Sequence, residues 1–222
     1  DLTLSLNFDE VNIDEKNSQV YFTALKKSSI ERHLYRIGFD GSGLERVTKD
    51  NGVHKVGFSP DGQYYLDSYS NSSTLPSLTL HKNDGTNLHV LAKPRPELLQ
   101  GLNLQTPELF TIPTSDGFPM PAQILKPNDF DPGKSYPLIF HIYGGPSAPT
   151  VFDQWQGSSL FFDNMLLDRG YLVVKFDHRS ATAISKKLEN RLIKMMSGPI
   201  EIVDILDGIH WLKSQSYIDP DR

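Results

Sequence analysis

The 222-residue sequence contains no cysteine. Disulfide bonds and thiolate metal sites are therefore excluded, although this absence does not identify the compartment. No apolar run approaches the roughly 18 residues of a membrane-spanning helix, and no signal-peptide pattern opens the chain; residues 1–10 look instead like the inside of a folded region. The net charge of −5 argues against a nucleic-acid partner held by a basic surface.

A second absence concerns catalysis. The sequence contains no Gly-x-Ser-x-Gly pattern, which is the elbow that presents the serine nucleophile of an α/β-hydrolase. Ser147 follows Gly144-Gly145-Pro146 without that pattern, so we expect no reactive role for it. No histidines and carboxylates stand at the spacing of metal ligands, and we expect neither a metal nor a cofactor.

The composition is that of an ordinary globular protein, with 38% apolar and 22% charged residues. The length allows one or two domains with a real core. Up to residue 95, short β-rich segments alternate with turn signals. We expect strands over residues 20–24, 33–39, 53–58, 63–69, 77–81 and 88–92.

Asp-Gly pairs punctuate this first part at residues 40–41, 61–62 and 84–85, a spacing of about twenty residues that is typical of antiparallel hairpins. A four-stranded propeller blade is about forty to fifty residues of this texture. The segment therefore predicts roughly one and a half to two blades, too few to close a ring. The alternative is a small free-standing sandwich, whose open edges would need protection that the sequence does not supply.

Beyond the stiff Lys93-Pro94-Arg95-Pro96 link, and a short helix or loop over 97–104, the pattern changes. Apolar runs alternate with segments of helical spacing, which predicts a parallel sheet covered by helices on both faces. We expect strands over 108–113, 119–126, 138–143 and 171–176, and helices over 158–169 and 199–214.

The most informative segment is Tyr136–Pro146, a buried apolar strand that breaks off at Tyr143-Gly144-Gly145. In an α/β-hydrolase the turn after the third strand carries donors to the oxyanion. A phenol donates a hydrogen bond in its neutral form, so Tyr143 is suited to stabilise negative charge in a transition state. The alternative is a tyrosine that caps the strand and packs against it.

Other polar residues are expected to be structural. His141 lies inside a strand and is interpreted as a packed or hydrogen-bonded histidine, while His178, at a strand end, is the better polar candidate. We expect Asp177 and Arg179 to tie their loop by ion pairing. The last helix carries polar residues that we interpret as a solvated or helix-start acidic stripe and a surface or structural histidine: Glu201, Asp204, Asp207 and His210.

The order of these segments resembles the prolyl oligopeptidase family of serine peptidases, most closely its dipeptidyl peptidase IV branch. The resemblance covers nearly the whole chain, and its most specific element is Tyr136-Pro137-Leu138 leading to Tyr143-Gly144-Gly145-Pro146. The other motifs that carry it are Tyr21-Phe22-Thr23, Ser59-Pro60-Asp61-Gly62, Phe176-Asp177-His178-Arg179, Gly198 with Glu201 and Asp204, and Ile218-Asp219-Pro220-Asp221-Arg222.

This resemblance implies an α/β fold in which antiparallel β-propeller blades precede the N-terminal part of the doubly wound sheet of an α/β-hydrolase. Residues 1–95 would be the C-terminal blades, 96–106 a linker, and 107–222 a peptidase domain truncated before the nucleophile elbow. Tyr143 would be half of the oxyanion hole. The Ser, Asp and His of the triad would lie outside this chain, the serine just beyond Arg222, so we expect the chain alone to be inactive.

The resemblance also implies a function. The parent protein would remove N-terminal dipeptides, after proline or alanine, from peptide substrates through an acyl-enzyme, as a homodimer in the periplasm or outside the cell. Two alternatives stay open: an acylaminoacyl peptidase or esterase of the same fold, and a non-catalytic propeller–hydrolase binding protein. The stretch Ser180–Ile184 lacks the glycines usual in the branch, and the paired glutamates that hold a peptide's amino terminus lie in an earlier part of the propeller, so substrate preference rests on the resemblance alone.

Overall fold

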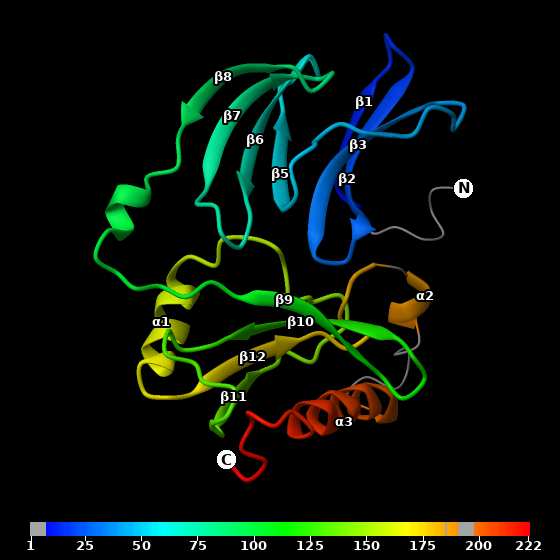
Figure 1. The fold of residues 1–222 in the computed structure, drawn as a ribbon. Coiled ribbons are helices and arrows are strands. Elements are labelled where there is room, and N and C mark those ends of the chain that lie inside the picture. Colours follow the sequence, from blue (N-terminus) through cyan, green and yellow to red (C-terminus); the bar gives the residue numbers. More distant parts are fainter. Residues whose placement is uncertain (1–7, 185, 191–197) are drawn as a thin grey trace. The chain divides into compact units, whose positions relative to one another are not determined.

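The chain divides into two units, each with its own sheet structure. The computed structural model describes residues 8–184, 186–190 and 198–222. The first unit comprises Asp1–Gln100 with Phe152–Trp155, and the second Gly101–Val151 with Gln156–Arg222. Most of the secondary structure is β-strand and the helices are few (Figure 1). The expectation of a folded region over residues 1–10 lies mainly outside the described residues.

The first unit consists of two antiparallel four-stranded meanders that follow one another along the chain (Figure 1). The first contains β1 (Phe8–Asp14), β2 (Gln19–Ser28), β3 (Glu31–Gly38) and β4 (Glu45–Arg46). The second contains β5 (Val53–Phe58), β6 (Tyr64–Ser70), β7 (Ser77–Lys82) and β8 (Asn87–Ala92). Strands that are neighbours in sequence are thus neighbours in each meander, as in a propeller blade, and a parallel bridge between Arg32 and Val53 joins the two.

Three hairpins of this unit, β3–β4, β5–β6 and β7–β8, close on the Asp-Gly pairs. In each pair the glycine has a positive φ, between +66° and +94°, a conformation that glycine adopts without strain. Each aspartate carboxylate accepts the backbone N–H two residues further on, which makes an Asx turn. These bonds run from Ser42 to Asp40, from Gln63 to Asp61 and from Thr86 to Asp84. The local chemistry of the turns therefore explains why Asp-Gly occupies them.

Two buried histidines lie where the meanders meet. The rings of His33 in β3 and His54 in β5 have centroids 5.3 Å apart, and their exposed fractions are 0% and 3%. Each donates to a carboxylate, His33 Nε2 to Glu31 at 2.9 Å and His54 Nδ1 to Asp67 at 2.8 Å. Because buried polar groups are tolerated when they are hydrogen-bonded, polar side chains can occupy this junction.

Two strands of the first unit, β1 and β4, were not predicted from the sequence. In β1, Val11 and Ile13 are 49% and 61% exposed, so the strand has no buried apolar stripe for an alternating pattern to reveal. β4 has two residues, too few for any alternation to be recognised.

The short segment Phe152–Trp155 belongs to the first unit although it lies far along the chain. The N–H of Asp153 donates to the Ile30 carbonyl at 2.8 Å, and its carboxylate accepts the N–H of Ser72 at 2.8 Å. The N–H of Trp155 donates to Ser70 Oγ at 3.2 Å. The segment thus contacts both meanders.

The second unit is built on a four-stranded mixed sheet in the order β11-β12-β10-β9. Its strands are β9 (Glu108–Pro113), β10 (Pro119–Leu125), β11 (Leu138–His141) and β12 (Leu172–Phe176). Of the described strands, β11 and β12 pair in parallel, whereas β12 with β10 and β10 with β9 pair antiparallel. The expectation of a parallel sheet is therefore correct for one pair only. An apolar run in the sequence indicates that both faces of a strand are buried, but it does not indicate the direction of the strand. That direction depends on the connection to the neighbouring strand, which for β9 and β10 is a tight turn and therefore makes them antiparallel.

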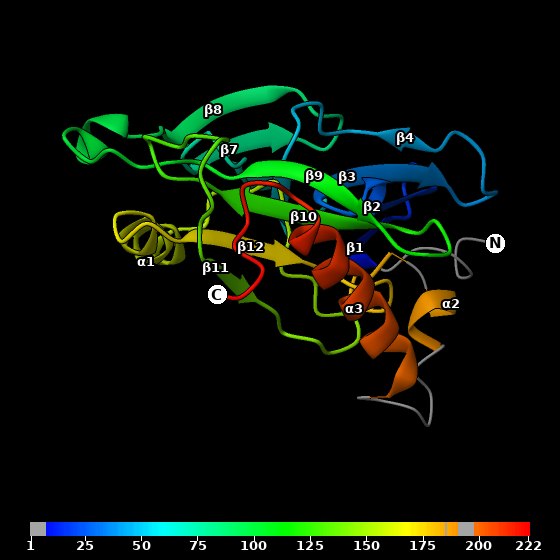
Figure 2. The same ribbon diagram turned by 60° about the horizontal axis from the view of Figure 1, so that its bottom comes forward.

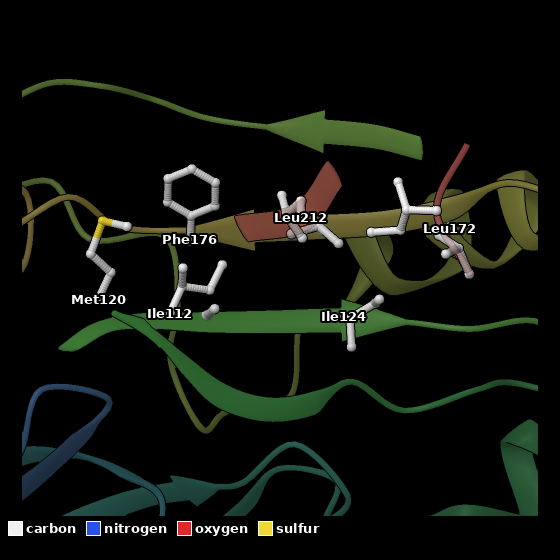
Figure 3. Packing of buried hydrophobic residues seen from close by; sticks show 9 residues of the cluster. Ile112, Met120, Ile124, Leu172, Phe176 and Leu212 are labelled. Carbon is white, nitrogen blue, oxygen red and sulfur yellow. The ribbon is translucent and has the colours of Figure 1, made fainter. Parts of the chain in front are cut away.

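Helices lie on both faces of this sheet. Lys175 of β12 points toward Asp163 of α1 (Ser158–Leu167), whereas the alternate residues of the strand face α3 (Pro199–Lys213), which Figure 2 brings to the front. α2 (Lys186–Glu189) is a single turn. The core on the α3 face is shown in Figure 3 and contains Ile112, Met120, Ala122, Ile124, Leu172, Val174, Phe176, Leu212 and Ile218.

Gly208 of α3 lies directly on the ring of Phe176, because a Cβ atom at this position would be 2.3 Å from Cζ of that ring. We predict that Gly208→Ala lowers the melting temperature of the whole protein. Displacing a buried ring costs about 1–3 kcal/mol, more than the helix propensity of up to about 1 kcal/mol that alanine adds. Differential scanning fluorimetry measures the effect.

The control for this prediction is Gly57→Ala in β5, where an added Cβ would meet open space. This variant is expected to melt at the wild-type temperature. A Gly208→Ala variant that is as stable as the wild type would contradict the close packing of α3 on β12.

Candidate oxyanion site

Tyr143 lies in a loop two residues beyond the end of β11, which stops at His141. The predicted strand 138–143 is therefore two residues too long, and the Tyr143 side chain is 73% exposed. Gly144 has a φ of +78°, in the left-handed region that favours glycine. A Cβ atom on Gly145 would lie 2.5 Å from Cε1 of Tyr143, so the ring lies over this glycine. The two glycines thus let the chain turn and let the phenol cross the turn toward solvent.

Asp177, the residue after β12, fixes the segment beyond the glycines. Its carboxylate accepts the N–H of Thr150 at 2.9 Å, the hydroxyl of Thr150 at 2.7 Å and the N–H of Val151 at 2.9 Å. Asp177 is 3% exposed. Burial raises the pKa of its carboxyl above the ordinary value, and these donors oppose that rise. The expected ion pairing of Asp177 is therefore replaced by bonds to backbone and hydroxyl groups.

The next residues reach the glycine turn itself. His178 is 1% exposed, and its Nε2 lies 3.2 Å from the carbonyl oxygen of Gly144. The N–H of Ser147 donates to the carbonyl of Ser180 at 2.9 Å. The segment 177–180 therefore contacts the Tyr143 loop at successive points along its length.

Arg179 anchors the segment 177–180 to the rest of the second unit. Its guanidinium pairs with Asp204 of α3 and with Asp116 of the β9–β10 turn, each at 2.7 Å. Its backbone N–H also donates to Asp204, at 3.0 Å. The hydrogen bonds to Asp116 and Asp204 raise the pKa of Arg179 above its ordinary value, and the same contact holds the pKa of Asp116 well below its usual range. Arg179 thus ties its loop by ion pairing, as expected.

Of the two interpretations of the acidic residues of α3, the solvated stripe is wrong, whereas the helix-start role is confirmed for Glu201. Glu201 and Asp204 are 3% and 1% exposed. Glu201 accepts the N–H of Gly198 at 2.6 Å and so caps the helix start. Asp207 accepts the N–H and the hydroxyl of Ser115 at 2.7 and 2.9 Å. The three-residue spacing puts all three carboxylates on one helix face, and that face turns toward the protein.

A second polar cluster, which was not predicted from the sequence, lies on the α1 face of the sheet. Lys175 contacts Asp163 at 3.0 Å and Gln156 at 3.1 Å, and Gln156 donates to Gln123 at 2.7 Å. His141 lies 3.6 Å from Asp163 and its side chain is 40% exposed, so it is less tightly packed than the sequence interpretation holds. Within the described part of the chain, no group of three or more His, Asp or Glu side chains is arranged to hold a metal ion.

Comparison with known proteins gives matches along the whole chain. Residues 7–76 match the family described as the dipeptidyl peptidase IV (DPP IV) N-terminal region. The chain is 30% identical over 221 residues to dipeptidyl peptidase 8 of Homo sapiens and 31% identical over 218 residues to the probable dipeptidyl-aminopeptidase B of Emericella nidulans. These alignments cover 96% and 95% of this chain but 24% and 23% of the relatives, so the chain spans about a quarter of their length.

A solved structure shares the fold. The crystal structure of Porphyromonas gingivalis dipeptidyl peptidase 4 has a TM-score of 0.86 and 23% identity, over 96% of this chain and 30% of that chain. These matches define the class, a β-rich segment similar to part of the dipeptidyl peptidases. The matches support a fragment of the dipeptidyl peptidase IV-like branch of the prolyl oligopeptidase family, in agreement with the resemblance drawn from the motifs. The role of Tyr143 stays a prediction.

We predict that Asp204→Asn destabilises the second unit by about 3–5 kcal/mol, because it leaves the buried charge of Arg179 without a full partner. The matched control is Glu45→Gln, the same chemical change in a carboxylate that is 49% exposed and pairs with Arg36 at 2.7 Å. Its cost is expected to stay below about 1 kcal/mol. Urea denaturation of the whole protein measures both losses, and equal losses would contradict an anchoring role for Arg179.

Acid should weaken the second unit through Asp116. Its pKa is lower in the folded than in the unfolded state because of Arg179, so the ionised carboxylate favours folding. This contribution is present above about pH 4 and is lost as the pH falls toward the lowered pKa. We predict that Asp116→Asn makes the melting temperature less dependent on pH between about 4 and 2.

The comparison for this pH dependence is Asp129→Asn, a change at an exposed aspartate of the same unit. That variant is expected to keep the wild-type slope of melting temperature against pH. If Asp116→Asn also keeps the full slope, the Asp116–Arg179 pair does not contribute to acid stability.

Proposed function

We propose that the chain is part of a serine-type dipeptidyl peptidase in which Tyr143 donates a hydrogen bond to the oxyanion. The observation that carries the proposal is the placement of Tyr143, an exposed phenol at the carboxyl end of a parallel strand, on a glycine turn held by a second loop. Attack on a carbonyl by serine puts negative charge on its oxygen, and donors already in place lower that barrier. A neutral phenol supplies such a donor.

The domain assignment follows the same proposal. Residues 1–95 are taken as the last blades of a β-propeller, 96–106 as a linker, and 107–222 as the N-terminal part of an α/β-hydrolase domain. The two meanders of the first unit support the first assignment. A mixed sheet with helices on both faces, in which the antiparallel strands β9 and β10 precede the parallel pair, supports the last.

The serine, aspartate and histidine of the triad are proposed to come from other parts of the whole protein. Residues 217–222 pair with Tyr136 and with Leu138, the first residue of β11, at the sheet edge that no described strand occupies. The N–H of Tyr136 donates to the Tyr217 carbonyl at 3.0 Å, and the N–H of Asp219 donates to the Tyr136 carbonyl at 2.8 Å. This alternation is that of a parallel pair. A strand added along this edge would end beside the Tyr143 loop, where a nucleophile elbow is required.

The proposed substrates are peptides that lose an N-terminal dipeptide after proline or alanine, in keeping with the dipeptidyl peptidase names of the relatives. A homodimer of the whole protein stays a prediction. Among the helices that the structure describes, none is long and apolar enough to cross a membrane.

We predict that Tyr143→Phe in the whole protein lowers kcat for glycyl-prolyl-p-nitroanilide by about 100–1000-fold. KM should change little, because the lost hydrogen bond forms fully only in the transition state. Release of nitroaniline measures both constants. Tyr64→Phe, at an exposed tyrosine of β6, is the control and should leave kcat unchanged.

The outcomes separate the proposal from its alternatives. An undiminished kcat in Tyr143→Phe would contradict the oxyanion role. If the wild-type protein instead hydrolyses an acylaminoacyl or ester substrate and not the dipeptidyl anilide, it is another hydrolase of the same fold. If it hydrolyses none of them, it is a binding protein.

A further inference from the structure

The orientation of Tyr143 depends on the backbone of its turn. The side chain is 73% exposed, and its ring contacts Gly145, which offers no side chain to hold it. Gly144 has a φ of +78°, and the backbone of glycine has more conformational freedom than that of any other residue. An oxyanion donor has to be held within a fraction of an ångström of its productive position. Something other than the ring's own packing must therefore fix this turn.

His178 supplies a contact at that point. Its Nε2 lies 3.2 Å from the Gly144 carbonyl oxygen, and because a carbonyl oxygen only accepts, Nε2 carries the proton and donates. The ring is 1% exposed, so packing limits the rotamers it can adopt. Its backbone is fixed on both sides, by the Asp177 bonds to Thr150 and by the ion pairs of Arg179. A buried donor between two anchored residues thus binds the carbonyl of the first glycine of the Tyr143 turn.

The other contacts of the loop act further from the phenol. Ser180 accepts the N–H of Ser147, and Asp177 holds Thr150 and Val151. These bonds fix where the loop goes after its turn, but they do not contact the peptide group between Gly144 and Gly145. Among the described residues, the hydrogen bond to the carbonyl of that next residue, Gly144, comes from His178.

We propose that His178 is a positioning residue of the oxyanion site: by holding the Gly144 carbonyl it fixes the direction in which the Tyr143 phenol points. This inference rests on the proposed function of Tyr143. His178 does not touch substrate and transfers no proton, so its effect passes entirely through Tyr143.

The test is a double-mutant cycle in the whole protein, with glycyl-prolyl-p-nitroanilide as substrate. His178→Ala should lower kcat about 10-fold, the effect of losing one neutral hydrogen bond. KM should stay unchanged. His178→Gln can place its amide N–H near the former Nε2 position and should recover most of kcat. His178→Asn is too short to reach Gly144 and should resemble alanine. Should His178→Ala fold poorly, the glutamine and asparagine variants carry the comparison.

The decisive arm is the variant that combines Tyr143→Phe with His178→Ala. If His178 acts through Tyr143, the second change adds less than about 2-fold to the loss from Tyr143→Phe alone. A further full 10-fold loss in the double variant, a His178→Asn variant as active as His178→Gln, or an effect on KM alone would overturn the proposal. If Tyr143→Phe itself leaves kcat unchanged, the proposed function fails; if only His178→Ala leaves kcat unchanged, the positioning role fails and the proposed function stands.

Discussion

The second unit depends on the buried ion pair between Arg179 and Asp204. The guanidinium lies 2.7 Å from the carboxylate, and both groups are shielded from water, with exposed fractions of 7% and 1%. A buried charge left without its partner costs several kcal/mol, so α3 and the loop after β12 are held together. Asp116 binds the opposite side of Arg179 and adds the β9–β10 turn to the same junction. One side chain thereby joins three segments that are distant in sequence.

The residues next to Arg179 in sequence connect this junction to the Tyr143 loop. Asp177 and Ser180 bind the outgoing part of the loop, and His178 binds its glycine turn. The two glycines allow the turn and let the phenol ring lie over Gly145. Glycine also gives the backbone more conformational freedom than any other residue. Hydrogen bonds from the buried segment 177–180 limit the conformations that this turn can adopt.

Much of this fold could be predicted from the sequence, because its signals are local. The Asp-Gly pairs predict three hairpins of the first unit, and β5 and β9 match their predicted bounds. β1 carries no recognisable pattern, because its apolar residues Val11 and Ile13 are exposed. Strand direction in the second unit depends on connections that apolar runs do not encode. The family was recognised because its motifs are spaced characteristically along the chain.

Only part of the candidate site could be inferred from the sequence. Tyr143 was singled out by its neighbours, two glycines after a strand, and its role stays a prediction. Asp204 looked like a solvated helix residue, because charge in a sequence suggests exposure unless a partner is known. Its partner, Arg179, lies 25 residues away, and such pairing is a property of the folded chain. The contact between His178 and Gly144 spans 34 residues and was hidden for the same reason.

A crystal structure of the whole protein with a covalent boronic acid that mimics the tetrahedral intermediate would show whether Tyr143 donates to the oxyanion. We expect the Tyr143 hydroxyl oxygen to lie about 2.5–3.0 Å from the oxyanion mimic, with the Gly144 carbonyl still bound by His178. An inhibitor bound to the serine whose oxyanion is contacted by other donors, with the Tyr143 phenol turned away, would contradict this expectation.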